Sequence, residues 1–320
     1  MARADNRKQN LIDAEAARPL GIVVVTYNSA GCLPALLDSL AAGLEGVADY
    51  KIVIADNASI DDTLDIAAAH PARPTIVETG RNGGYAWAIN VGCEHFSDVA
   101  DVLVLNPDLR MTSGAASALQ KRLQETDIGI VVPKVLSDDG EVYPSLRREA
   151  SISATWVTAV LGGHRAAKLG LNDIVYDSAE YERAHDVDWA TGAALLISAR
   201  ARATIGQWDE SFFLYSEEVD YMRRARQSGF RVLYAPEATV IHTGGPREAN
   251  PQLFSLMTIN RLRDFARRNG RVKTLALRLG MILDAALRAP FSAGQRAAFS
   301  ALLRSPDQHE LLRTSQPPQR

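Results

Sequence analysis

The chain has 320 residues, 47% of them apolar and 23% charged, and a formal net charge of −3. This composition is ordinary for a globular protein with a sizeable core, organised as one large domain or two smaller ones. The two cysteines, Cys32 and Cys93, are too few for a disulfide framework or a cysteine-based zinc site, and they fit a reducing cytosol.

Neither a secretory signal nor a membrane span is expected. The first ten residues include basic side chains but no apolar stretch behind them. The most apolar stretch, 274–288, is interrupted by Arg278, Asp284 and Arg288, whereas a membrane span needs about 20 apolar residues in a row.

Charge is distributed unevenly along the chain. Residues 250–320 contain 12 Lys/Arg and 4 Asp/Glu, which gives +8, whereas residues 1–249 contain 23 and 34, which gives −11. The acidic body argues against nucleic acid as a partner, and the basic end predicts contact with an anionic partner.

The first half of the chain predicts an α/β fold. Short β-branched runs alternate with segments whose apolar residues recur at helical spacing. Continuous apolar strands that alternate with helices indicate a mostly parallel central sheet with helices on both faces. The strands are expected at 21–28, 51–57, 74–79, 101–106 and 128–133, and the helices at 32–44, 59–70, 84–96 and 112–126.

The second half is expected to be less regular until its helical end. Residues 140–188 resemble an insertion that faces an acceptor, and they precede a strand at 189–198 and a helix from Ser216 to Gly229. The final Q-P-P-Q tail is expected to be disordered. The predicted parts are a polar lead-in (1–19), one domain (20–249) with a nucleotide-binding half (20–135) and an acceptor-side half (136–249), and a basic helical extension (250–320).

Polar side chains follow each of the first four predicted strands. Because the carboxyl ends of parallel strands meet at one edge of a sheet, these side chains are expected to form one rim, and a nucleotide is expected to bind there. The rim consists of Thr26, Tyr27, Asn28, Asp56, Asn57, Asn82, Gly83, Asn106 and Asp108.

The rim also offers a candidate metal site. Asp108 ends the stretch L-N-P-D, which is either a Pro-fixed turn or a site where Mg²⁺ or Mn²⁺ binds with a substrate diphosphate. His242 at a later strand end is either a core histidine or a further ligand. No G-x-G-x-x-G or G-K-[ST] follows a strand, which argues against dinucleotide oxidoreductases and P-loop enzymes.

The stretch Y-S-E-E-V-D at 215–220 has two interpretations. Ser216 is a favourable N-cap, acids stabilise a first helical turn, and Asp220 can pair with Arg224. That interpretation leaves the preceding aromatic stretch W-D-E-S-F-F-L-Y unexplained, because a solvated helix start needs no apolar lining. A role for these acids in proton transfer therefore remains open at this point.

Six stretches in chain order resemble the motif pattern of glycosyltransferase family 2, and within it the bacterial rhamnosyltransferase branch. The resemblance covers residues 20–245 and implies a GT-A fold, inverting transfer from a nucleotide-diphosphate sugar, and Mg²⁺ or Mn²⁺ as cofactor. The stretches are V-V-T-Y-N-S, D-N-A-S-I-D-D-T, N-G-G-Y-A-W-A-I-N-V-G, L-N-P-D, W-A-T-G-A and G-Q-W-D-E-S-F-F-L-Y-S-E-E-V-D-Y-M-R-R-A-R-Q-S-G-F.

On the donor side, the resemblance assigns nucleoside binding to the first two strand ends. Thr26, Tyr27 and Asn28 would act together with Asp56 and Asn57. Asp56 would accept a hydrogen bond from the ring N–H of the base.

The resemblance also assigns the metal, the base and the acceptor pocket. Asp108 keeps only the second acid of the D-x-D metal motif, and His242 would supply another metal ligand. Glu217 and Glu218 match a Glu-Asp pair, so that Glu218 would be the general base, kept ionised by the helix N-terminus. The pocket between donor and acceptor would be lined by Trp189, Gly192 and Ala193.

These assignments predict a rhamnosyltransferase, with dTDP-rhamnose favoured as donor and a glycan or lipid-linked acceptor in cell-envelope polysaccharide synthesis. The alternatives are a non-catalytic nucleotide-sugar or glycan binding module and a family 2 enzyme that uses a UDP-sugar or GDP-sugar. The missing acid and the Glu at the Asp position favour the binding module.

The extension is expected either to associate with a membrane or to pack on the body. Leu275, Leu279, Ile282 and Ala286 share one helical face near several arginines. A basic amphipathic helix of this kind lies in an anionic membrane surface without spanning it. Such an enzyme would be cytoplasmic and peripheral on the inner face of the membrane.

Overall fold

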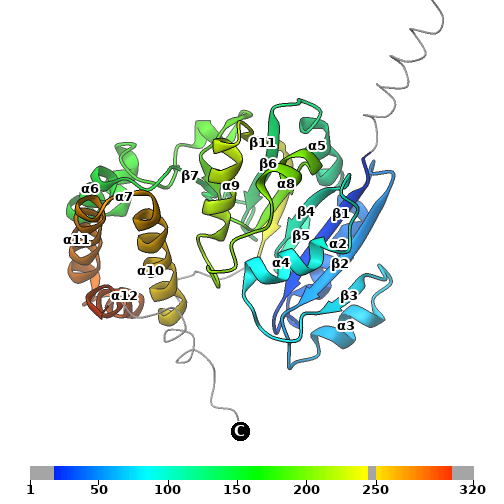
Figure 1. Cartoon of the computed structure of the whole chain (residues 1–320), viewed down its shortest axis with the longest axis horizontal. Coiled ribbons are helices and arrows are strands. Elements are labelled where there is room, and N and C mark those ends of the chain that lie inside the picture. The colour runs from blue at the N-terminus through cyan, green and yellow to red at the C-terminus, as the bar shows by residue number, and fades with distance from the viewer. Residues whose placement is uncertain (1–17, 244–249, 305–320) are drawn as a thin grey trace, which may run out of the picture.

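The computed structural model describes residues 18–243 and 250–304. Its centre is a sheet of nine strands, in the order β3-β2-β1-β4-β10-β6-β11-β5, with β8 also paired to β11 (Figure 1). The strands are β1 (Leu20–Thr26), β2 (Tyr50–Asp56), β3 (Thr75–Glu78), β4 (Asp101–Leu105), β5 (Leu109–Met111), β6 (Ile128–Leu136), β8 (His185–Asp186), β10 (Ala194–Ile197) and β11 (Arg231–His242).

The predicted mostly parallel sheet is confirmed, with two differences. β1 to β4 pair in parallel, and β6 and β11 run in the same direction as they do. β10 lies between β4 and β6 and is antiparallel to both, so the strand at 128–133 is not the neighbour of the strand before it. β5, expected as part of a loop, is a short antiparallel strand at the sheet edge. Hydrophobic periodicity identifies a buried strand but carries no information on its neighbours.

Helices cover both faces of the sheet, as expected for its apolar strands. In β1, Leu20, Ile22 and Val24 pack into one core cluster, while Val23 and Val25 point into the other, because successive side chains alternate between faces. The first cluster includes side chains of α2 (Leu33–Gly43), α3 (Thr63–Ala69) and α5 (Ala115–Arg122), and the second those of α4 (Tyr85–Cys93), α8 (Ala199–Ile205) and α9 (Glu217–Gln227).

A helical lobe with its own core stands beside the sheet (Figure 1). It contains the predicted C-terminal helices, and α6 from the middle of the chain packs on α11. The Trp156 indole donates to the carbonyl of Ala276 at 3.0 Å, and Gly280 lets α6 approach so closely that a Cβ there would lie 3.1 Å from Thr155. The helices are α6 (Ile152–Leu161), α7 (Gly163–Lys168), α10 (Pro251–Arg268), α11 (Arg271–Arg288) and α12 (Ala293–Arg304).

The segment between α7 and β10 has little regular structure. It holds a short 3₁₀ helix, η1 (Ser178–Tyr181), and the strand β9 (Trp189–Ala190), which pairs with β7 (Leu146–Arg147). The polar tail and most of the lead-in lie outside the described residues. Among the helices that are described, none is long and apolar enough to cross a membrane.

Candidate active site

The ends of β1 and β2 are tied together by a buried carboxylate. Asp56 is fully buried and accepts hydrogen bonds from the Thr26 hydroxyl at 2.7 Å and from the hydroxyl and amide of Ser59 at 2.6 and 2.8 Å. Three of its roughly four acceptor positions are thus used within the protein. The structure brings the first predicted rim residues together, while the role of Asp56 toward a base stays a prediction.

The turn after β1 presents its side chains at the rim. Asn28 adopts a left-handed conformation, with φ of 50°, and its side-chain oxygen accepts from the amide of Ile60 at 2.9 Å. Asparagine tolerates this conformation better than most residues. Tyr27 is 43% exposed, so its ring is accessible at the rim.

The third strand end is joined to the second and to the loop before α9. The Asn57 amide donates to the carbonyl of Gly84 at 3.0 Å, and Asn82 accepts from the amide of Gly84 at 3.2 Å. Gly84 has φ of 94°, and a Cβ there would lie 2.2 Å from the carbonyl oxygen of Phe213. Only glycine fits this position, because both the backbone conformation and the space exclude a side chain.

Asp108 and His242 lie side by side, although 134 residues separate them in the sequence. β5 and the end of β11 are paired, which places the His242 Nε2 atom 3.1 Å from Oδ2 of Asp108. The other oxygen of Asp108 is buried without a hydrogen-bond partner. The described residues contain no cluster of three or more His, Cys, Asp and Glu side chains suited to a metal ion. A cation here would therefore need further oxygen ligands from a substrate.

The acid pair is buried and does not form a solvated helix start. Glu217 and Glu218 are 3% and 6% exposed at the first turn of α9. Ser216 occupies the predicted N-cap position, and its carbonyl accepts from the amide of Asp220 at 3.0 Å, but its side chain makes no capping hydrogen bond. Its backbone is left-handed with φ of 77°. The expected pair between Asp220 and Arg224 is confirmed at 2.8 Å.

Tyr85 connects the acid pair to the rim. Burial and the nearby carboxylates of Glu217, Glu218 and Asp108 raise the pKa of Tyr85 well above its ordinary value. The phenol therefore stays protonated and donates a hydrogen bond to the Gly192 carbonyl at 3.0 Å. The three acids predicted to act on donor and acceptor thus share one electrostatic environment around this hydroxyl.

Of the predicted pocket residues, Trp189 belongs to β9, whereas Gly192 and Ala193 lie in the turn between β9 and β10. A Cβ on Gly192 would lie 3.4 Å from Cβ of Glu218, so this turn lies directly beside the side chain of that acid. The Ala193 carbonyl accepts from the amide of Asn106 at 2.8 Å, which joins the pocket to the end of β4. Trp189 is partly buried and donates from its indole to the Arg148 carbonyl at 3.0 Å.

Two residues that contact these elements were not identified from the sequence. Tyr85 could have been predicted, because it directly follows the N-G-G motif at a helix start, and a phenol there lies next to the rim. Asn260 could not have been predicted, because it stands in the middle of a helical pattern and only the tertiary fold brings it against the loop before Glu217.

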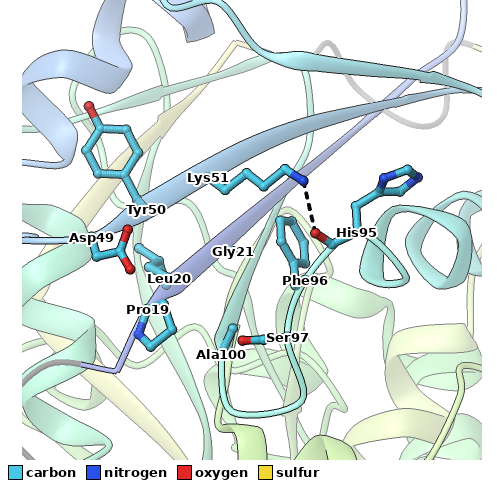
Figure 2. A pocket seen from close by; sticks show the side chains of 10 residues that line it. All are labelled: Pro19, Leu20, Gly21, Asp49, Tyr50, Lys51, His95, Phe96, Ser97 and Ala100. Atoms are coloured by element: carbon cyan, nitrogen blue, oxygen red, sulfur yellow. Dashed lines mark hydrogen bonds between the residues drawn. The ribbon is translucent and has the colours of Figure 1, made fainter.

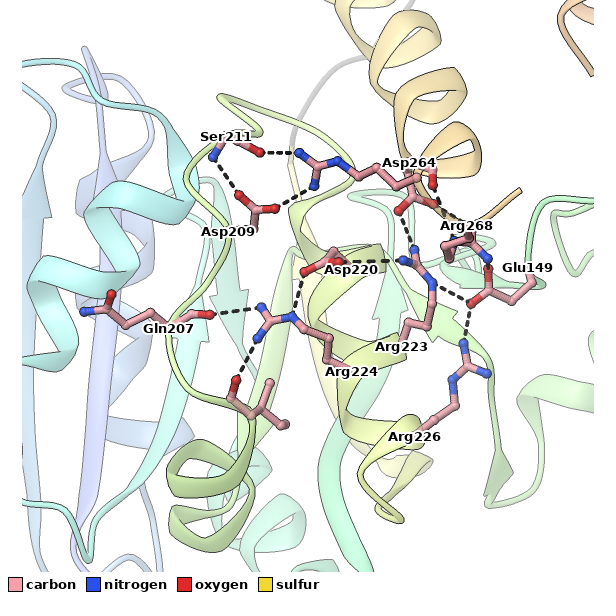
Figure 3. Close-up of polar contacts among 12 residues, drawn as sticks. Glu149, Gln207, Asp209, Ser211, Asp220, Arg223, Arg224, Arg226, Asp264 and Arg268 are labelled. Carbon is pink, nitrogen blue, oxygen red and sulfur yellow. Dashed lines mark hydrogen bonds and ion pairs between the residues drawn. The ribbon is translucent and has the colours of Figure 1, made fainter. Parts of the chain in front are cut away.

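An ion-pair network joins α9 to the helical lobe. Arg223 is buried and lies 2.6 Å from Asp264 of α10, 3.4 Å from Glu149 and 3.6 Å from Asp220 (Figure 3). Arg268 of α10 reaches the same Glu149 at 3.2 Å. The helix that carries the acid pair is therefore fixed to the C-terminal extension by groups that are largely removed from water.

A separate cavity lies at the opposite end of the strands. It has a volume of about 160 Å³ and is lined by the amino ends of β1 and β2, including Gly21 and Tyr50, and by the segment after α4 with Phe96 (Figure 2). Ligand pockets typically measure about 300–1,000 Å³. This cavity is therefore smaller than a typical ligand pocket, and it lies at the other end of the strands from the predicted donor rim.

Solved structures share this architecture and define its class. The mannosyltransferase PcManGT from Pyrobaculum calidifontis, in complex with GDP-Man and Mn²⁺, has a TM-score of 0.54 and 15% identity, covering 94% of this chain and 84% of that one. GalNAc-T7 with UDP, GalNAc and Mn²⁺ has a TM-score of 0.55 and 12% identity, covering 94% and 57%. The chain has the GT-A fold of nucleotide-sugar transferases, as expected.

Sequence relatives narrow the class to a family. Residues 21–178 match the model of Glycosyl transferase family 2. N-acetylglucosaminyl-diphospho-decaprenol L-rhamnosyltransferase of Mycobacterium tuberculosis is 30% identical over 234 residues, covering 70% of this chain and 75% of the relative. Rhamnosyltransferase WbbL of Escherichia coli is 23% identical, covering 69% and 82%. The chain belongs to glycosyltransferase family 2, in its rhamnosyltransferase-like branch, and it is a glycosyltransferase.

Proposed function

We propose that this enzyme transfers L-rhamnose from dTDP-rhamnose, with inversion, to a hydroxyl of a lipid-linked glycan in cell-envelope polysaccharide synthesis. Both relatives named above are rhamnosyltransferases by name, and the name of the mycobacterial one specifies a lipid-linked acceptor. The observation that carries the proposal is the buried pair Glu217–Glu218, which lies beside Gly192 and shares the environment of Tyr85 with Asp108.

The donor would lie along the rim of β1 to β4. Tyr27 offers an exposed ring for the base and Asn28 an exposed side chain beside it, while the buried Asn57 would support this surface through its bond to Gly84. Asn82 and Gly83 come from the third strand end, beside the diphosphate in this arrangement. The fixed, mostly buried carboxylate of Asp56 keeps the first two strand ends in register, so that the nucleoside meets a preformed surface.

The residues around Asp108 fit a divalent cation. Asp108 has one buried oxygen without a partner, and the imidazole of His242 lies next to the other oxygen. Mg²⁺ and Mn²⁺ are commonly held by one or two protein ligands together with substrate phosphates. When bound there, the cation would neutralise charge on the departing diphosphate.

Glu218 would take the proton from the acceptor hydroxyl. The acceptor oxygen forms a bond to the anomeric carbon, the bond from that carbon to the diphosphate breaks, and the electron pair leaves with the nucleotide. The proton of the hydroxyl passes to Glu218, so no covalent sugar–enzyme intermediate is required. Gly192 lies beside the Glu218 side chain, on the side from which the acceptor hydroxyl would approach in this proposal.

Assays of sugar release test this proposal. The expected result is that Mn²⁺ supports hydrolysis or transfer of dTDP-rhamnose in preference to UDP-glucose and GDP-mannose, that EDTA stops it, and that Asp108→Ala abolishes it. Equal turnover in EDTA, with Asp108→Ala still active, would contradict the metal assignment. Preference for UDP-glucose or GDP-mannose would contradict the donor assignment while leaving transfer intact.

The proposed partner of the C-terminal extension is an anionic lipid surface, on the inner face of the cell membrane. α11 exposes Val272 by 83%, Leu275 by 54% and Leu279 by 48%, and the neighbouring α6 exposes Val160 by 66%. Exposed basic side chains, Arg271 and Lys273, stand in the same first turn of α11. Apolar side chains beside basic ones suit an anionic lipid surface.

The exposed face differs from the one expected from helical spacing. Ile282 packs against the core of the lobe and Ala286 is only partly exposed. Two of the expected basic partners are also engaged within the protein: Arg278 donates to the Leu302 carbonyl at 3.0 Å and Arg288 to the Thr158 carbonyl at 2.9 Å. One side of α11 therefore packs on the lobe, as one expectation required, while the exposure of its first turns supports the proposed membrane contact.

Vesicle flotation tests the association. The intact chain is expected to float with vesicles that contain phosphatidylglycerol, less with pure phosphatidylcholine vesicles, and less at high salt. The double variant Leu275→Glu, Leu279→Glu should lose flotation, whereas Val99→Glu, at an apolar position outside the lobe that is even more exposed, should not. Flotation of the double variant at the wild-type level would contradict the assignment.

A further inference from the structure

We propose that Asn260 of α10 is a positioning residue for the acid pair, so that the C-terminal extension forms part of the active site. The inference rests on the proposed roles of Glu217 and Glu218. It is based on a strained loop that precedes the pair and on the side chain that holds this loop.

Two successive residues before the acids have an unfavourable backbone conformation. Tyr215 has φ of 68° and Ser216 has φ of 77°, and neither is glycine. A left-handed conformation costs a residue with a Cβ atom about 1–2 kcal/mol. The loop keeps this conformation only if its surroundings stabilise it, and strain of this kind is concentrated at functional sites.

Asn260 supplies that stabilisation. Its side chain is fully buried, and its amide nitrogen donates to the carbonyl of Leu214 at 2.9 Å and to that of Tyr215 at 3.3 Å. Its oxygen accepts from the guanidinium of Arg263 at 3.2 Å. Because arginine is only a donor, this contact fixes the orientation of the amide with its nitrogen toward the loop.

The same loop is held on its other side by the nucleotide-binding half. The amide of Tyr85 donates to the carbonyl of Phe213 at 2.8 Å. Farther along the loop, Arg267 of α10 lies 2.6 Å from Asp209. The loop therefore runs between α4 and α10, and Asn260 of α10 contacts it at Tyr215, two residues before Glu217.

The location of the strain determines which kinetic constant Asn260 controls. Without its two hydrogen bonds, Tyr215 and Ser216 can relax to negative φ, which turns the start of α9 and moves both acids. The ends of β1 and β2 in the donor rim are held by their own hydrogen bonds, from Thr26 to Asp56 and from Asn57 to Gly84, in which Asn260 takes no part. Loss of Asn260 should therefore lower kcat and leave the KM for the donor almost unchanged.

Steady-state kinetics of Asn260→Ala is the first test. We expect kcat to fall about 10- to 100-fold, because a displacement of about 1 Å in a reacting group can cost 10²-fold. Asn269→Ala is the matched control, since this asparagine of the same region also donates to a backbone carbonyl, that of Phe265, at 3.0 Å. The control should keep the wild-type kcat. A rise in donor KM with unchanged kcat in Asn260→Ala would overturn the inference.

A second substitution distinguishes positioning from simple loss of packing. In the background of Asn260→Ala, Ser216→Gly should restore part of kcat, because glycine adopts positive φ without the steric cost. A variant damaged only in the packing of α10 would gain nothing from a glycine in the loop. Absence of any recovery would count against the inference.

Hydrogen exchange provides a readout that does not depend on the donor. Asn260→Ala should speed amide exchange in 213–219, while 20–26 and 50–56 stay protected as in the wild type. Unchanged exchange in 213–219 would overturn the inference. If the wild type fails to turn over dTDP-rhamnose but the loop responds as expected, the proposed donor is wrong and the positioning role stands.

Discussion

The two sides of the active site are built in different ways. On the donor side, Thr26, Asp56 and Asn57 stand at the ends of neighbouring strands and are joined by short-range hydrogen bonds across the sheet. On the acceptor side, Glu217 and Glu218 follow a strained loop that is held by α4 and by α10. The donor side is formed by the ends of neighbouring strands, whereas the acceptor side requires α4, the loop before Glu217 and α10 to come together.

This difference assigns distinct functions to the two sides. A surface built from strand ends is preformed and suits binding, since its side chains are fixed before the ligand arrives. A carboxylate pair on a loop that is held from two directions suits chemistry, where placement within about 0.5 Å matters. Substitutions on the donor side should therefore change binding, and those on the acceptor side should change kcat.

The largest expected effect is that of Glu218→Gln. Glutamine keeps the shape of the side chain but cannot accept the proton, so kcat should fall about 10²- to 10⁴-fold while the donor still binds. Transfer rates at saturating donor measure the loss of kcat, and calorimetric titration of dTDP measures binding.

Glu217→Gln is the matched comparison for that experiment. It removes the neighbouring carboxylate, which in this arrangement orients the loop or the acceptor, and it should cost less. If Glu217→Gln is the inactive variant and Glu218→Gln is near wild type, the base is the preceding residue. If both stay active, the proton acceptor lies elsewhere.

The next largest effect is on stability, at the contact between α9 and the lobe. Asp264→Asn removes the closest partner of the buried Arg223 and leaves its charge partly uncompensated. Breaking a buried pair costs about 3–5 kcal/mol, and the remaining contacts of Arg223 to Glu149 and Asp220 should reduce this to about 2 kcal/mol. Thermal unfolding should show a Tm lower by about 4–8 °C.

Asp220→Asn serves as the control for that measurement. Asp220 pairs with Arg224 within one helix, and a pair of this type contributes about 0.3–0.5 kcal/mol. The contact of Asp220 with Arg223, at 3.6 Å, is longer than the 2.6 Å contact of Asp264, so its loss should cost less. Arg224 also keeps its hydrogen bonds to the carbonyls of Ile205 and Gln207. Equal shifts in Tm for the two variants would show that the buried contact with α10 is no more important than the local one.

The smallest expected effect is that of Asp56→Asn on the donor side. The substitution weakens the hydrogen bonds that join the ends of β1 and β2, at a cost of about 1.4 kcal/mol. The KM for the donor should rise about tenfold with little change in kcat. A fall in kcat comparable to that of Glu218→Gln would abolish the distinction between the two sides.

Most of the donor side could be predicted from the sequence. Short apolar runs identified β1 to β4, and the rule that ligands bind beyond the carboxyl ends of parallel strands placed Thr26, Asp56 and Asn106 on one rim. Asp108 and His242 were each considered as metal ligands because they follow strands, and the family resemblance assigned both to one site; the pairing of β5 with β11 accounts for their contact.

The acceptor side could be predicted only in part. The acids of α9 were recognised, but the expected side-chain cap by Ser216 is not formed, because local propensity cannot reveal that tertiary contacts hold this residue at positive φ. Asn260 was not recognised at all, since an asparagine inside a helical pattern is indistinguishable from a solvent-exposed one.

The sequence by itself determined which residues are buried in strands, which polar groups end those strands, and which family the motifs resemble. These properties depend on residues that are close in the sequence, because the spacing of apolar residues indicates strands and helices, and the residue types between them indicate turns. The tertiary structure alone decided that β10 enters the sheet between β4 and β6 and that α10 holds the loop before Glu217. Both depend on contacts between distant segments, whose free energy is gained only when the whole chain has folded and which no local pattern encodes.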